Sequence, residues 1–276
     1  MRRLRISAIS YLNTAPLMWD FENTPVGPQF EISYTIPSNC ARALAEGSAD
    51  IGIIPAAGYS RIPDLRILPD VAIAAKGAVR SILLISKVPI DRIRAVALDT
   101  SSLTSAALTR IVFDRWYGGQ ARFTPMEPDL SLMLRSHDAC LLIGDPALRV
   151  DHTRYLTCDL AEEWVSRTGK PFVFAFWAVR QDALELADAD LARVFQSSRD
   201  HGLEPHNLNR IAKLWAPRVG LTEDEVKTYL LENIYYHLDA PCLEGLRLFY
   251  QYGHECGALP DPLPIQFWEA PKTVVQ

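Results

Sequence analysis

Cysteine is scarce in this 276-residue chain, and the cysteines it has follow no metal or redox spacing. There are five of them, an odd number, and none belongs to a C-x-x-C pair. This pattern argues against a disulfide framework and against a zinc site of the usual spacing, and it fits reduced thiols in a cytosol. The sequence therefore predicts a cytoplasmic protein.

Long apolar runs and an excess of positive charge are also missing. The longest apolar run, residues 172–179, is far below the ~18–20 residues that cross a bilayer. Behind the basic start, Ser7, Ser10 and Asn13 interrupt the apolar stretch, so no export signal is expected. A formal net charge of −5 argues against nucleic acid as a partner, because a protein that binds nucleic acid normally has a basic face. We expect neither a membrane nor a nucleic acid as partner.

The common catalytic signatures are absent as well. The chain has no glycine-rich phosphate loop, no G-x-S-x-G elbow and no H-E-x-x-H motif. His201 and His206 lie five residues apart, but no cysteine or carboxylate stands near them at ligand spacing. The sequence thus predicts no metal site and no cofactor.

What the chain does contain is an alternation of strand-like and helix-like segments. This order is typical of α/β proteins with parallel sheets. The predicted strands are residues 4–9, 30–34, 51–54, 66–75, 81–86, 94–98, 121–124, 139–143 and 171–179. The predicted helices are 17–21, 37–47, 102–116, 130–136, 182–201, 208–215, 223–231 and 242–256, with an irregular tail from residue 258.

The order of these segments predicts two α/β lobes, one inserted into the other. The first lobe would hold residues 1–88 and 178–276, and the second would hold residues 89–177. The apolar strands 81–86 and 171–179 would be the crossovers between them. In such open sheets, ligands bind beyond the carboxyl ends of the strands, so we expect a ligand cleft between the lobes.

Two segments place hydroxyl and amide side chains where a helix should begin after a buried strand. A helix N-terminus carries unpaired N–H groups and the positive end of the helix dipole, so it attracts anions. Two such termini predict a cleft that holds one small dianionic molecule, such as a dicarboxylate, from both sides. The candidate binding residues are Ser10, Tyr11 and Asn13 in the first segment, and Thr100, Ser101, Ser102 and Thr104 in the second.

Each segment also has a purely structural explanation. Asn13 taken alone is best explained as an N-cap for the helix that Pro16 helps to start. The hydroxyl run from Thr100 to Ser105 is richer than capping requires, which favours anion binding there. Asp99 would be unwelcome beside an anion, so we expect it to cap the backbone or orient a neighbouring residue.

Further candidates flank two other strands. Arg80 and Ser81 begin a strand and should point to opposite faces, so at most one of them should face the ligand. Ser81 as a donor in the cleft and Arg80 in an ion pair between lobes are the competing uses. Gly144 and Asp145 follow a buried strand as a plain turn, where the glycine would also let a ligand approach the backbone. Trp177 is expected in the core.

Several of these segments together resemble one known family. They are residues 10–17 (SYLNTAPL), 79–84 (VRSILL), 98–105 (LDTSSLTS), 142–148 (LIGDPAL), 162–164 (EEW) and 171–177 (PFVFAFW). The chain resembles chorismate dehydratase of the futalosine route to menaquinone, collinearly from residue 6 to about residue 250. Ala78 is a minor departure, because we expect proline there in many members.

The resemblance implies the two-lobed fold of type II periplasmic binding proteins, used as a lyase. It implies removal of water from chorismate to give 3-[(1-carboxyvinyl)oxy]benzoate, without a cofactor, and it marks Asn13 and Ser81 as catalytic. We assign Asn13 to hold the departing hydroxyl or an adjacent carboxylate, and Ser81 to anchor the substrate or assist proton movement. Neither is a good base unaided, so a carboxylate of the substrate itself is the expected proton acceptor.

Other functions stay open at this point. The sister lyase that forms 1,4-dihydroxy-6-naphthoate shares the architecture, and we expect it to use a histidine in the cleft, such as His137. A non-catalytic small-anion binding protein would show the same cleft but would normally need an export signal. A homodimer is one assembly that the sequence leaves open.

Overall fold

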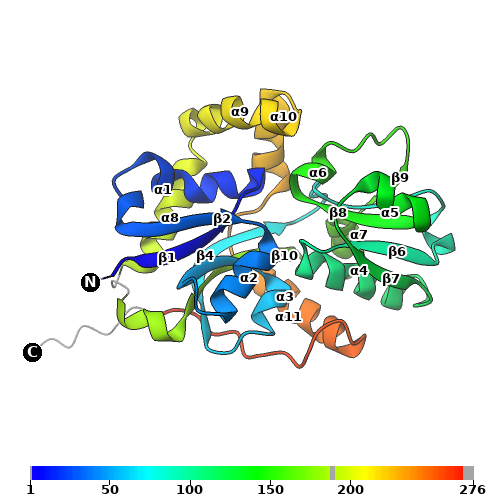
Figure 1. The fold of residues 1–276 in the computed structure, drawn as a ribbon, viewed down its shortest axis with the longest axis horizontal. Helices are drawn as coiled ribbons and strands as arrows, with labels where there is room; N and C mark the ends of the chain where they lie inside the picture. The colour runs from blue at the N-terminus through cyan, green and yellow to red at the C-terminus, as the bar shows by residue number, and fades with distance from the viewer. Residues whose placement is uncertain (1, 187–189, 270–276) are drawn as a thin grey trace, which may run out of the picture.

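The computed structural model describes residues 2–186 and 190–269 and has two five-stranded sheets (Figure 1). The first sheet has the spatial order β2 (Phe30–Thr35), β1 (Leu4–Ile9), β3 (Ile51–Pro55), β10 (Phe172–Arg180) and β4 (Leu65–Ala75). The second has the order β7 (Arg122–Met126), β6 (Ala95–Asp99), β8 (Ala139–Ile143), β5 (Ile82–Ser86) and β9 (Leu156–Asp159). Each sheet with its helices forms one lobe.

Helices pack on both sheets and join them. Before β10 they are α1 (Trp19–Asn23), α2 (Pro37–Ala45), α3 (Ala56–Tyr59), α4 (Leu103–Trp116), α5 (Leu130–Ser136), α6 (Gly144–Leu148) and α7 (Leu160–Thr168). The later ones are α8 (Leu191–Gly202), α9 (Pro205–Val219), α10 (Glu223–Thr228) and α11 (Ala240–Glu255), with a π-helical segment, Tyr229–Asn233, after α10. Short 3-10 helices are η1 (Leu12–Met18), η2 (Gly27–Gln29), η3 (Ile90–Arg92) and η4 (Gln181–Leu186). None of the described helices is long and apolar enough to cross a membrane.

Local sequence explains most of these elements. Alpha-helix α2 begins with Pro37 at its first position and is followed by Gly47 at φ +71°, in the left-handed region that glycine adopts without strain. In β5, alternate side chains face opposite sides: Ile82 and Leu84 join the large core, whereas Leu83 and Ile85 join a smaller cluster with Met133 of α5. Trp177 of β10 is fully buried, which confirms its predicted place in the core.

The prediction of parallel sheets is wrong in part. Parallel pairs are β1 with β2 and β3, and β6 with β7 and β8. Strand β10, however, runs antiparallel to β3 and β4, and β5 runs antiparallel to β8 and β9. Strands β5 and β10 each follow a segment of one lobe and join the sheet of the other. The alternation of strands and helices along the sequence does not predict the direction of such a strand.

The lobe limits at residues 88 and 177 stay a prediction, but the structure shows to which sheet each of the two apolar crossover strands belongs. Strand β5 belongs to the second sheet and β10 to the first. The chain therefore passes between sheets just before β5 and just before β10. Helix α11, orange in Figure 1, packs on both β10 and α4 and so ties the lobes together.

Some elements differ from the expected ones. Gly144 begins the short helix α6 instead of a plain turn, and neither β9 nor α7 was expected from the pattern. The helix predicted over 182–201 is η4 followed by α8, and residues 187–189 of it lie outside the described residues. The tail from residue 258 is largely irregular as far as residue 269, beyond which it too lies outside them.

Candidate active site

A cavity lies between the lobes, where loops from both sheets meet. Its interior volume is about 50 Å³, which is smaller than that of sites enclosing a drug-sized ligand. The first lobe lines it with Ile9, Tyr11, Asn13, Pro37, Pro55, Ile73, Phe174 and Ala175. The loop before β5 and the second lobe contribute Val79, Ser81, Ile82, Ser102, Thr104, Ser105, Ile143 and Gly144.

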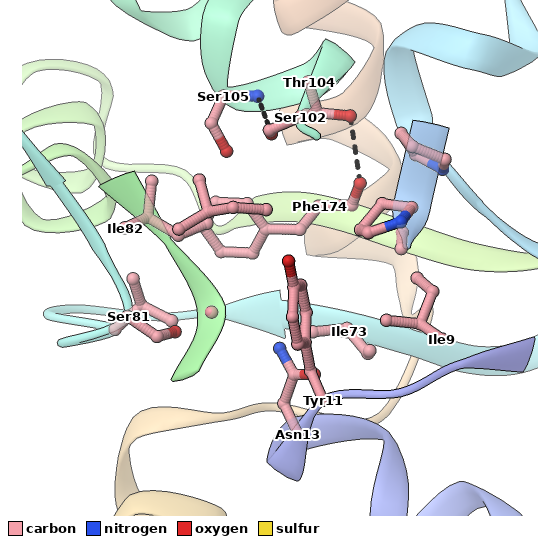
Figure 2. Close-up of a pocket in the computed structure, with 16 residues that line it drawn as sticks. Ile9, Tyr11, Asn13, Ile73, Ser81, Ile82, Ser102, Thr104, Ser105 and Phe174 are labelled. Carbon is pink, nitrogen blue, oxygen red and sulfur yellow. Dashed lines mark hydrogen bonds between the residues drawn. The ribbon is translucent and has the colours of Figure 1, made fainter. Parts of the chain in front are cut away.

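The polar residues of the lining form two groups that face each other. Figure 2 shows Tyr11, Asn13 and Ser81 on one side of the cavity and Ser102, Thr104 and Ser105 of the α4 start on the other. Apolar side chains, among them Ile82 and Phe174, lie between the two groups. The lining thus combines apolar walls with a few hydroxyl and amide groups, an arrangement typical of sites that orient a small ligand.

Asn13 does not cap a helix, so the prediction of an N-cap is wrong. Helix η1 begins at Leu12 with Tyr11 as its N-cap, and Asn13 is the second helical residue. Its amide oxygen accepts a hydrogen bond from Thr14 Oγ1 at 3.3 Å, and its amide nitrogen points into the cavity (Figure 2). The amide is thereby available to a ligand. Burial raises the pKa of the neighbouring Tyr11 phenol, which keeps that phenol protonated and able to donate.

Ser81 faces the cavity because the turn before it is held rigidly. The carboxylate of Asp159 accepts hydrogen bonds from the N–H groups of Val79 and Arg80 at 2.9 and 2.6 Å. Arg80 has φ +62°, in the left-handed region that non-glycine residues rarely adopt. Of the two side chains, Ser81 lines the cavity and Arg80 does not, which agrees with the expectation that at most one of them faces it. Within residues 2–186 and 190–269, Arg80 makes no ion pair, contrary to its predicted use.

The start of α4 lies at Leu103, one residue after the predicted start at Ser102. Ser102 is the N-cap, and its Oγ accepts a hydrogen bond from the N–H of Ser105 at 3.1 Å. Thr104 Oγ1 donates to the carbonyl oxygen of Phe174 at 3.1 Å and accepts from the N–H of Ala57 at 3.1 Å. Thr104 therefore joins α4 of the second lobe to two elements of the first.

Asp99 orients a neighbour, as expected. Its Oδ1 accepts hydrogen bonds from the N–H and Oγ of Ser101, at 2.8 and 2.5 Å. Burial raises the pKa of the Asp99 carboxyl, although these hydrogen bonds oppose the shift. The hydroxyl of Ser101 is committed to this carboxylate and does not line the cavity.

Three other predicted binding residues also lie outside the lining. Ser10 is exposed after β1, and its N–H pairs with the carbonyl of Thr35. Thr100 is exposed and donates to Glu127 Oε1 at 2.9 Å. Asp145 Oδ1 accepts from the N–H of Leu12 at 3.0 Å, and burial raises the pKa of its carboxyl. Ser10 and Thr100 thus form hydrogen bonds just beyond the ends of strands, and Asp145 forms one between the lobes.

Gly144 lets two chain segments approach closely. It has φ +62°, and a Cβ placed there would lie 2.8 Å from the ring of Tyr11. Its N–H donates to the carbonyl of Ser81 at 2.8 Å. The glycine thus brings the α6 start beside both Tyr11 and Ser81, and the close approach that it permits here is that of the Tyr11 ring. The expected approach of a ligand to this backbone stays a prediction.

Two tyrosines from the C-terminal part of the chain were missed by the sequence analysis. The Tyr229 hydroxyl donates to Ser81 Oγ at 2.8 Å, and the Tyr236 hydroxyl donates to the carbonyl oxygen of Asn13 at 3.0 Å. Both tyrosines are buried. Tyr229 falls in the predicted helix 223–231 and Tyr236 between that helix and the next, and no local signal shows that a buried phenol reaches a residue more than a hundred positions away.

Charged groups are missing from this site. No acidic, basic or histidine side chain is among the described residues that line the cavity. His137, the histidine considered for the sister lyase, instead places Nδ1 within 3.2 Å of the carbonyl of Met133. The α4 N-terminus remains as the electropositive feature of the second lobe at this cavity. On the other side, η1 is a 3-10 helix, in contrast to the α-helix expected there.

Comparisons with known proteins agree with this architecture. Chorismate dehydratase of Thermus thermophilus is 31% identical over 238 residues, which are 80% of this chain and 85% of that protein. Protein AF1704 of Archaeoglobus fulgidus matches 93% of this chain and 98% of its own, with a TM-score of 0.73 and 16% identity. The aliphatic sulphonate binding protein SsuA of Escherichia coli covers 100% of this chain and 95% of its own, with a TM-score of 0.65 and 17% identity.

The structural matches establish the fold alone, and it is the predicted two-lobed α/β fold of periplasmic binding proteins. The family follows from the sequence comparison. Residues 4–255 match the family model described as menaquinone biosynthesis. This chain therefore belongs to the menaquinone biosynthesis family.

Proposed function

We propose that this chain is a hydro-lyase that dehydrates chorismate to 3-[(1-carboxyvinyl)oxy]benzoate. The observation that carries the proposal is the convergence of Asn13, Ser81 and the α4 N-terminus on one cavity. Asn13 and Ser81 are the residues that the family resemblance marks. The relative with 31% identity is named chorismate dehydratase, and the match covers most of both chains.

The chemistry needs little from the protein beyond placement and charge stabilisation. The ring hydroxyl leaves with the electron pair of its C–O bond, and the neighbouring ring carbon loses a proton. The electron pair of that C–H bond becomes the third double bond of an aromatic ring, and hydroxyl and proton together make water. Since aromaticity supplies a large driving force, orientation of the substrate and stabilisation of developing charge are the main tasks.

We assign Asn13 to hold the departing hydroxyl or the carboxylate beside it, and Ser81 to anchor the substrate or assist proton movement. The hydroxyls of Tyr11 and Ser102 would complete the binding of the two carboxylates. The Thr104 hydroxyl and the Gly144 N–H already donate to the carbonyls of Phe174 and Ser81. With no acidic or histidine side chain among the described lining residues, the proposed proton acceptor is a carboxylate of the substrate.

The sister lyase is disfavoured by the same lining. We expect that enzyme to need a histidine facing its ligand, and none of the six histidines of the chain, all within the described residues, lines the cavity. A cytoplasmic location and a homodimer stay predictions from the sequence.

One assay tests the proposal directly. Purified protein incubated with chorismate should convert it to an aromatic product, followed by absorbance and by a mass lower by one water. Chorismate that binds, as measured by calorimetry, but stays unchanged would identify a binding protein and contradict the lyase. Chorismate that neither binds nor reacts would contradict both.

A further inference from the structure

The π-helical segment after α10 reaches both residues that we assign to catalysis. Tyr229, its first residue, is 1% exposed and donates to Ser81 Oγ at 2.8 Å. Asn233, its last, donates from Nδ2 to the carbonyl of Ala78 at 3.0 Å, and Tyr236 beyond it donates to the carbonyl of Asn13. Pi-helical turns are rare and are found frequently at functional sites.

The hydrogen of the Tyr229 hydroxyl is committed to Ser81. A phenol carries one hydrogen, and the described part of the structure offers it no acceptor other than Ser81 Oγ. Burial raises the pKa of the Tyr229 phenol, an effect that the nearby Ser81 hydroxyl and Asn13 amide only partly offset. Tyr229 therefore stays protonated and keeps donating.

The hydrogen bond from Tyr229 affects where the hydrogen of the Ser81 hydroxyl can point. A serine hydroxyl has one hydrogen and two acceptor positions, and one acceptor position is filled by Tyr229. Within residues 2–186 and 190–269, Ser81 Oγ donates to no protein group, and the residue lines the cavity. Its hydrogen is thus free to point toward a ligand.

We propose that Tyr229 is a positioning residue, which fixes the Ser81 side chain and directs the serine hydrogen into the cavity. This inference rests on the proposed function, because Ser81 is assigned there to the reaction. Tyr229 itself does not line the cavity and would act only through Ser81.

A double-mutant cycle tests this role. Tyr229→Phe keeps the ring and removes only the hydroxyl, so kcat for chorismate should fall roughly threefold to tenfold, as expected for loss of one buried hydrogen bond. KM should change by less than about twofold. In the Ser81→Ala background the same substitution should change kcat by less than about twofold, because its partner is gone.

Tyr250→Phe is the matched control. Tyr250 is 2% exposed and donates to the carbonyl of Ala56 at 2.9 Å, so its substitution also removes a buried phenol hydroxyl. It does not contact Ser81, and kcat should stay at the wild-type value. Melting curves of all variants then separate a loss of stability from a loss of turnover.

Three results would overturn the inference while leaving the lyase intact. They are an unchanged kcat in Tyr229→Phe, an equal loss of kcat in the Ser81→Ala background, or a rise in KM that accounts for the whole effect. A wild-type protein that makes no product would instead remove the proposed function, and this inference with it.

If Tyr229→Phe fails to fold, the double variant is compared with Ser81→Ala, because the double variant leaves no buried polar group without its partner. Equal kcat supports the inference, and a lower kcat in the double variant contradicts it.

Discussion

At the scale of single residues, the site depends on amide and hydroxyl groups whose neighbours hold them in place. Asn13 is kept from capping η1 because Tyr11 occupies that position, and Ser81 is fixed by hydrogen bonds at the turn before it. Gly144 supplies the close approach between the two segments.

Asn13→Ala should lower kcat for chorismate by about a hundredfold, in line with the removal of one donor that stabilises developing charge. KM should change by less than about threefold, because the interaction matters most in the transition state. Steady-state kinetics measure both values. Asn207→Ala is the control, since that exposed amide donates to the carbonyl of His201 at 2.8 Å, away from the cavity. Equal changes of kcat and KM in Asn13→Ala would contradict a transition-state role.

Gly144→Ala should lower both stability and affinity. The new Cβ strains a backbone at φ +62° and presses on the ring of Tyr11, so we expect a loss of about 1–2 kcal/mol of unfolding free energy. A rise in KM of severalfold should accompany it, because Tyr11 lines the cavity. Gly169→Ala separates the two effects: it has φ +67° with no atom within 4 Å of its Cβ, so only stability should fall. An unchanged KM in Gly144→Ala would show that the Tyr11 ring moves freely.

At the scale of elements, caps fix where the helices begin. Ser102, Asp159 and Asp239 each accept hydrogen bonds from the first turn of their helix, α4, α7 and α11 respectively. Asp239 does more than cap, since its Oδ2 accepts from the Tyr235 hydroxyl at 2.7 Å and lies 3.4 Å from Lys76 Nζ. Helix α11 packs on β10 and on α4, so its cap bears on the contact between the lobes.

The Asp239 carboxyl should make the free energy of unfolding depend on pH under acidic conditions. Burial alone would raise the pKa of its carboxyl, but hydrogen bonds from Cys242 and Tyr235 and the charge of Lys76 lower it to about 2. A carboxyl whose pKa is lower in the folded than in the unfolded protein stabilises the fold at pH values above its unfolded pKa, which is about 3.9 for aspartate. This contribution is lost as the pH falls toward 2. Asp239→Asn should therefore cost about 1 kcal/mol near neutral pH, and the gap to wild type should close between pH 4 and 2.

Urea unfolding of both proteins across this pH range measures that gap. Asp224→Asn is the comparison, because the Asp224 side chain is 90% exposed beside Lys227 and should show almost no effect. A constant gap between wild type and Asp239→Asn down to pH 2 would contradict the role given to Asp239.

At the scale of the whole molecule, hydrogen bonds between the lobes keep the cavity closed. Leu12 N–H donates to Asp145 Oδ1, and Ser38 N–H donates to the carbonyl of Ser101 at 3.2 Å. Thr104 adds a third bridge. We expect some of these contacts to open when a ligand enters, in which case their strength would set the balance between open and closed forms.

Asp145→Ala should shift that balance toward the open form. Loss of a hydrogen bond to a carboxylate should raise KM for chorismate roughly threefold to tenfold, and the radius of gyration of the free protein in small-angle X-ray scattering should increase. Asp145→Asn retains an acceptor oxygen for Leu12 and should resemble the wild type in both measurements. Identical behaviour of the two variants would show that charge, and not the bridge to Leu12, is what matters at Asp145.

Local sequence determined most of the strands and helices and the opposite directions of Arg80 and Ser81, because hydrophobic periodicity and strand alternation depend only on nearby residues. Family motifs also pointed to the correct fold. Only the tertiary structure decided that β5 and β10 join opposite sheets in antiparallel directions, and that Tyr229 reaches Ser81 across 148 positions. Such contacts depend on how the whole chain closes upon itself, and no local pattern records that.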